Sequence, residues 1–356
     1  MKEPTRRFGC GWLLLGALCA CGDEAEVPPA EPLPVLDLDP ASAAPTMVLE
    51  SITADADGML YVGDRVSGDL LRIDPAAKAA ARVARIAART VGGMDGVKAD
   101  PAGMIFDAQG NLLVASAPFS EVLRVNAANL DPQSPGSAET FVTGVAGANT
   151  LALDAAGRLY VSGGATGNIY RVEAQGGAAE TIARIEAFSR AVPPDGFMQA
   201  VVANGLAFDA TGALLVADTA RGAVWKIAIG ADGSAAAPTQ WVKAAPMLEC
   251  IDGLGFDAVG MLWGAVNEQN SLVTINASGS PQRMFKNDSN GPLEFPAALV
   301  FVGTSGYVVN FDRARRDNFA ADGTTSLDGV GASIVIVPST EPAPPPRPAN
   351  NGYGGY

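Results

Sequence analysis

One short pattern recurs along this chain: an apolar strand, a turn containing Asp and Gly, and a second apolar strand. The turn glycines are Gly58, Gly110, Gly157, Gly212, Gly260 and, in a degenerate copy, Gly306, so consecutive copies lie 52, 47, 55, 48 and 46 residues apart. A period of this length is typical of solenoids and propellers. Each of the early copies is followed by two more apolar segments of alternating polarity, which predict four short antiparallel strands per repeat. This is the pattern of a propeller blade, because solenoid repeats are usually shorter or helical.

The last repeat has only three predicted strands, whereas residues 34–38 form a strand that has no partner in the first repeat. Pairing this strand with the final blade would close the ring and remove its open edge. We therefore predict an all-β fold, a six-bladed β-propeller over residues 34–338 with four antiparallel strands per blade, closed by an N-terminal strand that completes the last blade. A chain of 356 residues is long enough for one such domain. Residues 339–356, rich in Pro and Gly, predict a flexible tail.

The start of the chain predicts a signal peptide over residues 1–20. Basic residues precede an apolar run at 8–18 that is too short to span a bilayer as a helix. The sequence Leu-Cys-Ala-Cys-Gly at 18–22 resembles the bacterial lipobox, which makes Cys21 the predicted lipidated residue; ordinary secretion with cleavage nearby is the alternative. Residues 21–33 are acidic and Pro-rich and predict an extended tether. We expect a lipid-anchored protein of the bacterial cell envelope, periplasmic or surface-exposed, that meets the membrane only through its anchor.

Composition excludes several classes of function. The chain has no histidine, which rules out Ser-His-Asp and Cys-His catalysis and every His-ligated zinc site. A net charge of −14 would repel nucleic acid. Of the four cysteines, only Cys250 lies beyond the signal and the anchor position, so no disulfide is expected. Chemistry in this chain must therefore depend on carboxylates and other oxygen ligands.

A repeat protein separates structural from functional residues by register. Asp107, Asp154, Asp209 and Asp257 each precede a turn glycine by three residues, where an Asp carboxylate binds backbone N–H groups, and we interpret them as structural. We interpret Asp64 and Asp218, which follow second strands, in the same way.

The position eight residues before each turn glycine is different. It lies at the start of the innermost strand, where the six blades converge on the central tunnel. In chain order it is occupied by Glu50, Ala102, Asn149, Asn204, Asp252 and Ala298. Two carboxylates and two amides at one depth would form a hard oxygen cage of the kind that Ca²⁺ prefers, and another divalent cation is the alternative to calcium. A structural role, in which these side chains cap the backbone at strand starts, remains open.

These residues resemble a known family, the regucalcin/gluconolactonase-type (senescence-marker-protein-type) propellers related to diisopropyl-fluorophosphatase and the paraoxonases. The resemblance covers nearly the whole predicted domain, and residues 204–209, Asn-Gly-Leu-Ala-Phe-Asp, carry it most closely. It implies six four-stranded blades around a calcium ion held by Glu50, Asn149, Asn204 and Asp252. The chain departs from the family where Glu50 lacks a following Gly-Pro and Asn149 a following Asp-Gly, and it has no counterpart of the paraoxonase-type histidines.

The function that we expect is calcium-dependent hydrolysis of a small-molecule lactone or related ester by a monomeric enzyme. The metal would polarise the carbonyl group, Asp252 would act as general base or as nucleophile, and Glu50 would balance charge. Residues 188–198, in the longest interval, predict a lid or specificity loop on the metal-bearing face with Arg190 and Phe197 as substrate contacts, and a featureless insertion is the alternative. Residues 94–98 lie on the same rim. A non-catalytic, calcium-stabilised binding module is the alternative. A glycosidase using Glu50 and Asp252 as a carboxylate pair is a third reading.

Overall fold

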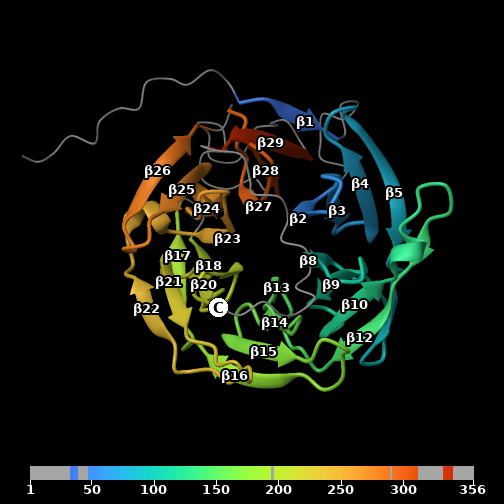
Figure 1. The fold of residues 1–356 in the computed structure, drawn as a ribbon, viewed down its shortest axis with the longest axis horizontal. Coiled ribbons are helices and arrows are strands. Elements are labelled where there is room, and N and C mark those ends of the chain that lie inside the picture. Colours follow the sequence, from blue (N-terminus) through green and yellow to red (C-terminus); the bar gives the residue numbers. More distant parts are fainter. Residues whose placement is uncertain (1–32, 39–46, 194–195, 289–290, 312–331, 340–356) are drawn as a thin grey trace, which may run out of the picture. The chain divides into compact units, whose positions relative to one another are not determined.

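The structure, a computed structural model, describes residues 33–38, 47–193, 196–288, 291–311 and 332–339. Within them, six sheets form successive blades around one axis (Figure 1). Blade 1 contains β2 (Leu49–Ala54), β3 (Leu60–Asp64), β4 (Asp69–Asp74) and β5 (Ala79–Arg85). Blade 2 contains β8 (Pro101–Phe106), β9 (Leu112–Ser116), β10 (Glu121–Val125) and β12 (Glu139–Thr143). Blade 3 contains β13 (Leu151–Leu153), β14 (Leu159–Ser162), β15 (Asn168–Val172) and β16 (Glu180–Arg184). Blade 4 contains β19 (Leu206–Phe208), β20 (Leu214–Asp218), β21 (Ala223–Ile227) and β22 (Thr239–Val242). Blade 5 contains β23 (Ile251–Phe256), β24 (Leu262–Val266), β25 (Ser271–Ile275) and β26 (Pro281–Lys286). Blade 6 contains β27 (Pro296–Val302), β28 (Ser305–Asn310), β29 (Ser333–Pro338) and β1 (Val35–Asp37).

The N-terminal strand closes the ring as the sequence predicts. Strand β1 pairs antiparallel with β29, so that Val35 lies opposite Val335 and the last blade gains its fourth strand. The prediction of a six-bladed, all-β propeller is confirmed. Of the described residues, the helices are three short 3₁₀ turns, at Ala127–Asn129, Pro246–Leu248 and Asn267–Gln269. None of these described helices has the length and apolar character required to cross a membrane.

Three additions to the blades were not predicted as strands. Strand β11 (Gly136–Ser137) leaves blade 2 and adds a fifth, parallel strand to the outer edge of blade 1. Two hairpins, β6–β7 (Arg89–Val91 and Met94–Val97) and β17–β18 (Arg190–Val192 and Phe197–Gln199), lie between an outer strand and the next innermost strand. The second hairpin falls within the segment predicted as a lid.

The turn aspartates have the structural role that their register predicts. In blades 1 to 5 the Oδ1 atom of this aspartate accepts hydrogen bonds of 2.9–3.1 Å from the backbone N–H groups two and four residues later. The turn glycine three residues after the aspartate has a φ between 79° and 83° in all five blades, a left-handed conformation that favours glycine. Asp64 and Asp218 likewise accept backbone hydrogen bonds after the second strands of their blades.

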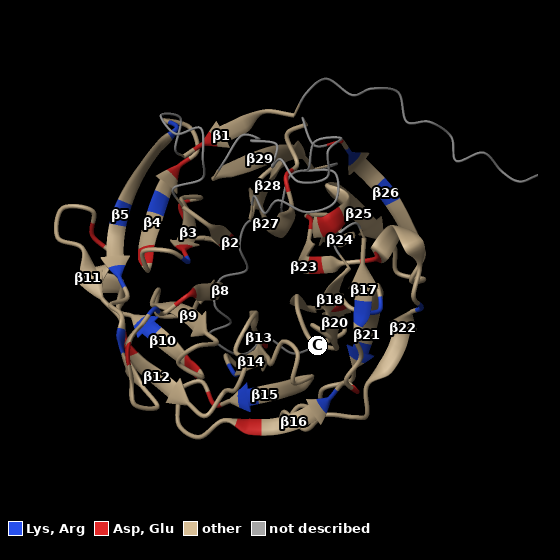
Figure 2. Cartoon of the chain, turned by 180° about the vertical axis from the view of Figure 1, so that it is seen from behind, with Lys and Arg blue, Asp and Glu red and all other residues tan. Residues whose placement is uncertain are grey.

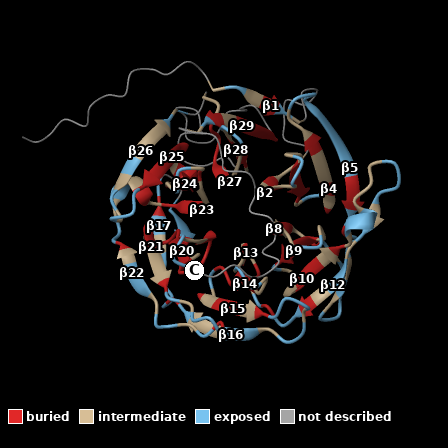
Figure 3. Cartoon of the chain, in the orientation of Figure 1, coloured by how far each residue is buried: buried red, intermediate tan, exposed pale blue. Residues whose placement is uncertain are grey.

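The apolar core is divided into six clusters, and each cluster lies between two neighbouring blades. Leu36 on β1 packs in the cluster that joins blade 6 to blade 1, together with Leu60 and Ile334. The second and innermost strands supply most of the buried residues, whereas the outermost strands are largely exposed (Figure 3). Ring closure therefore buries an interface on both sides of every blade.

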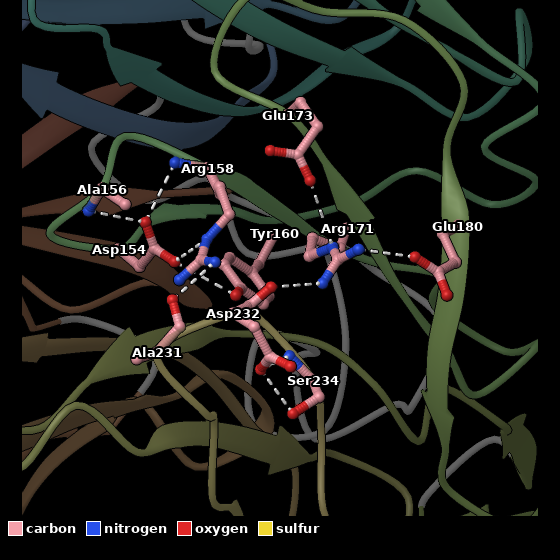
Figure 4. Close-up of polar contacts among 10 residues, drawn as sticks. All are labelled: Asp154, Ala156, Arg158, Tyr160, Arg171, Glu173, Glu180, Ala231, Asp232 and Ser234. Atoms are coloured by element: carbon pink, nitrogen blue, oxygen red, sulfur yellow. Dashed lines mark hydrogen bonds and ion pairs between the residues drawn. The ribbon is translucent and has the colours of Figure 1, made fainter.

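Neighbouring blades are also joined by polar contacts, most clearly between blades 3 and 4 (Figure 4). Arg158 donates a hydrogen bond to the carbonyl oxygen of Ala231 at 3.0 Å, and Arg171 donates one to that of Asp232 at 3.1 Å. Both arginines are bound as well to carboxylates of their own blade. Gly233 follows directly after the two acceptor residues, and a Cβ there would lie 2.6 Å from Nη1 of Arg171, so glycine allows the loop to approach.

Candidate metal and active site

The innermost strands contain very few charged residues. Among the six, β2, β8, β13, β19, β23 and β27, the charged residues are Glu50 on β2 and Asp252 on β23, and none contains Lys or Arg. Basic residues lie instead on middle and outer strands such as β4, β15 and β26 (Figure 2). Since an ionised side chain beside an apolar core is costly, two carboxylates at this register indicate a function.

Local backbone geometry explains how these side chains are placed. The pairing of β2 with β3 is irregular between Leu49 and Ile52, and that of β23 with β24 between Ile251 and Leu254, so Glu50 and Asp252 both lie in bulges. A bulge interrupts the ladder and redirects the side chain. In blades 3 and 4 the residue at this register lies two positions before the strand, and its N–H donates to the second strand at 2.9 Å.

Glycines let the inner strands approach each other. Gly103, Gly205 and Gly253 each follow the residue at the ligand register, which is the position eight residues before the turn glycine of a blade. A Cβ on them would lie 2.3, 2.2 and 2.6 Å, respectively, from a backbone carbonyl oxygen of the next blade. The N–H of Gly103 donates to that carbonyl oxygen, the one of Asn149, at 2.6 Å. Close packing around the tunnel thus depends on residues without a Cβ, and it brings side chains from separate blades within reach of one another.

The structure brings the four predicted ligands to one place. Glu50, Asn149 and Asp252 line the same cavity. Asn204 accepts a hydrogen bond on Oδ1 from Nδ2 of Asn149 at 2.9 Å and also bonds to Asp252. Apolar side chains two residues further along the chain than the predicted ligand position line the same cavity: Ile52, Met104, Leu151, Leu206 and Leu254.

Each of three ligand-register side chains is held by the residue fifteen positions later, just after the second strand of its blade. Arg65 binds Oε2 of Glu50, Thr219 accepts from Nδ2 of Asn204 at 2.9 Å, and Nδ2 of Asn267 donates to Oδ2 of Asp252 at 3.0 Å. These supporting residues were not predicted from the sequence. The repeat register points to them, since three of the four blades with a polar residue at the predicted ligand position also carry a polar residue fifteen positions later, and blade 3 has Gly164 there.

Arg65 connects two carboxylates. It binds Glu50 through Nη1 and Asp100, which precedes blade 2, through Nε and Nη2, the latter at 2.5 Å. Its guanidinium carbon also lies 5.2 Å from the ring centre of Phe311. Neither Arg65 nor Asp100 was identified from the sequence.

The two cavity carboxylates differ in their electrostatic environment. Burial raises the pKa of Asp252 to about 8, Glu50 adds to this, and the hydrogen bond from Asn267 opposes it. Burial also raises the pKa of Glu50, and the charge of Arg65 works against it. Two desolvated carboxylates in one cavity repel each other unless a proton or a cation intervenes.

The donor set fits a hard divalent cation. Oε1 of Glu50 and Oδ1 of Asn149 have no hydrogen-bond partner among the described residues, and both residues line the cavity with Asp252. Carboxylate and amide oxygens from different blades are ligands of the kind that Ca²⁺ takes. Over the described ranges no three side chains of Asp, Glu, Cys or His come together in a metal-binding group, so the amides would have to take part.

The residues predicted as substrate contacts, Arg190 and Phe197, are not among the residues that line the cavity. Arg190 on β17 forms an ion pair of 2.9 Å with Glu249 and donates to the sulfur of Cys250 at 3.5 Å, which ties the hairpin to the start of β23. Phe197 on β18 is 38% exposed. Their contact with substrate stays a prediction, and Cys21 lies outside the described residues.

Six four-stranded blades, with oxygen-bearing side chains gathered where their inner ends meet, define the class of this protein as a six-bladed β-propeller with a polar centre. The SMP-30/gluconolactonase/LRE-like region matches residues 48–306, and the chain belongs to that family. No curated protein matches the chain in sequence.

Solved structures resemble this fold at low sequence identity. A luciferin-regenerating enzyme is 16% identical with a TM-score of 0.60, covering 87% of this chain and 97% of its own. The calcium-binding protein regucalcin from Agrobacterium tumefaciens is 14% identical with a TM-score of 0.58, covering 85% and 95%. A gluconolactonase from Xanthomonas campestris is 15% identical with a TM-score of 0.57, covering 82% and 86%. At this identity the likeness establishes the fold.

Proposed function

We propose that this protein is a calcium-dependent hydrolase of a lactone or related small ester. Family membership supports a lactonase-like function, and regucalcin, a calcium-binding protein, shares the fold. The observation that carries the proposal is the convergence of Glu50, Asn149 and Asp252 on one cavity, with Asn204 bonded to the last two. A calcium ion held by these four residues would act as a Lewis acid on the substrate carbonyl.

The chain's own residues divide the remaining work. We assign Asp252 as the proton acceptor: its carboxylate would take a proton from the water as the water oxygen bonds to the carbonyl carbon, and would pass that proton to the ring oxygen when the ring C–O bond then breaks. Asn267 fixes the orientation of Asp252 through its bond to Oδ2. Attack by Asp252 itself, as a nucleophile, is the second route that this position allows. Glu50 balances charge, and the apolar layer below excludes water.

The test is a panel of lactones and phosphotriesters assayed with the full chain, with and without a chelator. We expect lactone turnover that the chelator abolishes and calcium restores, and a loss of at least about 100-fold in D252N because a general base contributes 10²–10⁴. D209N, which changes a turn carboxylate outside the cavity, is the matched control. Turnover indifferent to chelation, or a fully active D252N, would contradict the assignment.

A non-catalytic, calcium-stabilised binding module is the second candidate. It is favoured by the engagement of Glu50 with Arg65 and by the absence of histidine, which leaves Asp252 to serve both as ligand and as base. Calcium binding that raises the melting temperature, without turnover of any substrate in the panel, would decide for this reading.

We further propose that the protein works at the cell envelope, anchored through a lipid on Cys21. The support is the lipobox-like sequence at residues 18–22. Partitioning of the wild type into a detergent phase, lost in C21S, tests the anchor, whereas equal partitioning of the two proteins would refute it.

A further inference from the structure

Arg65 differs from the residues that support predicted ligands at the same register in blades 4 and 5. Thr219 and Asn267 support Asn204 and Asp252 from the same register with neutral side chains, whereas blade 1 places a guanidinium there. Neutral support would suffice to orient Glu50 by the same geometry. A permanent cation next to a predicted cation ligand is therefore the exception in this ring, and it needs a physical reason.

We propose that Arg65 is a built-in cation that shares Glu50 with the calcium ion, stabilises the inner ring by itself, and lowers the affinity of the site for calcium. This inference rests on the proposed function and concerns the same site. It assigns to Arg65 a role in setting the calcium concentration at which the site fills.

Charge at the inner ends of the blades supports this role. Arg65 interacts electrostatically with three carboxylates, those of Glu50, Asp100 and Asp252. Removing it would leave the two carboxylates that line the cavity, and Asp100 on the far side of the guanidinium, without this cation, which raises the attraction for a divalent ion. Buried charges without partners also destabilise a fold strongly, so the same removal makes folding depend more on calcium.

The side chain is held in place rather than free to leave. Nε and Nη2 form a two-pronged contact with Asp100, and the guanidinium lies over Phe311, so only Nη1 reaches Glu50. Oε1 of Glu50 keeps no protein partner among the described residues. A calcium ion bound through that oxygen would share the carboxylate with Arg65 and meet its repulsion, since Asp100 prevents the guanidinium from moving away.

Calcium titration calorimetry on the chelator-treated full chain tests this. R65N gives blade 1 the support that Asn267 gives blade 5, R65Q keeps more of the aliphatic stem, and R65K keeps the charge. The matched control is R89N, because Arg89 likewise pairs with a carboxylate, Glu121 at 2.6 Å, and lies over an aromatic ring, but outside the cavity.

We expect R65N and R65Q to bind calcium at least about tenfold more tightly than the wild type, because a unit charge beside a divalent ion is worth more than one power of ten. R65K and R89N should keep the wild-type affinity. Melting temperatures should lead to the same conclusion as the titrations. R65N should melt at a lower temperature than the wild type without calcium and regain its stability with calcium, whereas calcium should raise the melting temperature of R89N as much as that of the wild type.

Equal or weaker binding by R65N and R65Q would overturn the inference and make Arg65 a residue that merely positions Glu50. Folding of these variants only in the presence of calcium supports it. Absence of binding in all proteins overturns it, together with the calcium dependence of the proposed function. Tighter binding in the variants without lactone turnover in any protein would refute the proposed function and leave the inference standing.

Discussion

Gly205 is the position at which a single methyl group would separate two predicted ligands. It follows Asn204 on the way into β19, and its ideal Cβ would lie 2.2 Å from the carbonyl oxygen of Asp252 and 2.8 Å from the backbone nitrogen of Leu254. Both atoms are backbone, so no side chain can rotate away. In G205A the inner strands of blades 4 and 5 must therefore move apart by about 1 Å to restore ordinary contact.

The magnitude follows from two opposing effects. Overpacking costs about 1–3 kcal/mol and more where the surroundings cannot yield, whereas replacing glycine by alanine returns about 0.4–1 kcal/mol through the unfolded chain. A rigid backbone contact places G205A at the upper end, and we expect a loss of about 2–3 kcal/mol in the free energy of unfolding. Calcium affinity should fall about tenfold, since sites tolerate displacements of only about 0.5 Å.

Urea denaturation followed by tryptophan fluorescence measures the first effect and calcium titration the second. The matched control is G255A: that Cβ would also face the next blade, but its nearest neighbour, the carbonyl oxygen of Leu299, lies at 3.2 Å and needs to yield by only a few tenths of an ångström. We expect G255A to stay within about 1 kcal/mol of the wild type. If G205A were as stable as G255A and bound calcium equally well, the close approach of the inner strands would not be what positions the site.

Two further predictions concern stability away from the cavity. D257A should lose about 3 kcal/mol or more, because Oδ2 of Asp257 accepts from the buried Nε1 of Trp263 at 2.9 Å in addition to the turn bonds; D107A, whose carboxylate binds no aromatic donor, should lose less, and equal losses in urea denaturation would refute the reasoning. The hydrogen bond from Arg85 lowers the pKa of Asp69 below its ordinary value of 3.8, so its contribution is present above that pH and lost as the pH falls through the lower, folded-state value. D69N should therefore unfold earlier than the wild type at pH 7 and like the wild type at strongly acid pH, and a difference that persisted in acid would count against this ion pair.

The repeat made much of the fold and the candidate ligands predictable. Because the blades are copies of one unit, a residue type that recurs at one register in every blade can be told from one that occurs only in some blades. This comparison distinguished Asp257, whose counterparts recur, from Asp252, five residues earlier in the same strand-turn unit. What register alone could not give was the partner of each ligand. Arg65 reaches Asp100 across the boundary between blades, and a contact between blades depends on strand geometry that no local pattern encodes. The parallel strand β11 was not predicted for the same reason, since its two residues follow a strand of blade 2 but pair with β5 of blade 1.

The asymmetry between the two cavity carboxylates bears most directly on mechanism. Glu50 and Asp252 occupy the same register, yet one is bound by a cation and the other by the neutral amide of Asn267. Where the surroundings of two titratable groups push their pKa values apart, the two groups divide the acid and base roles between them. Burial raises the pKa of Glu50 as well, but the charge of Arg65 opposes that shift and favours the charged form of Glu50. Burial raises the pKa of Asp252 to about 8 although the charge of Arg65 opposes the shift, and we expect Asp252 to be the carboxylate that accepts the proton from water. We therefore expect Asp252 in blade 5 to transfer the proton and Glu50 in blade 1 to balance charge.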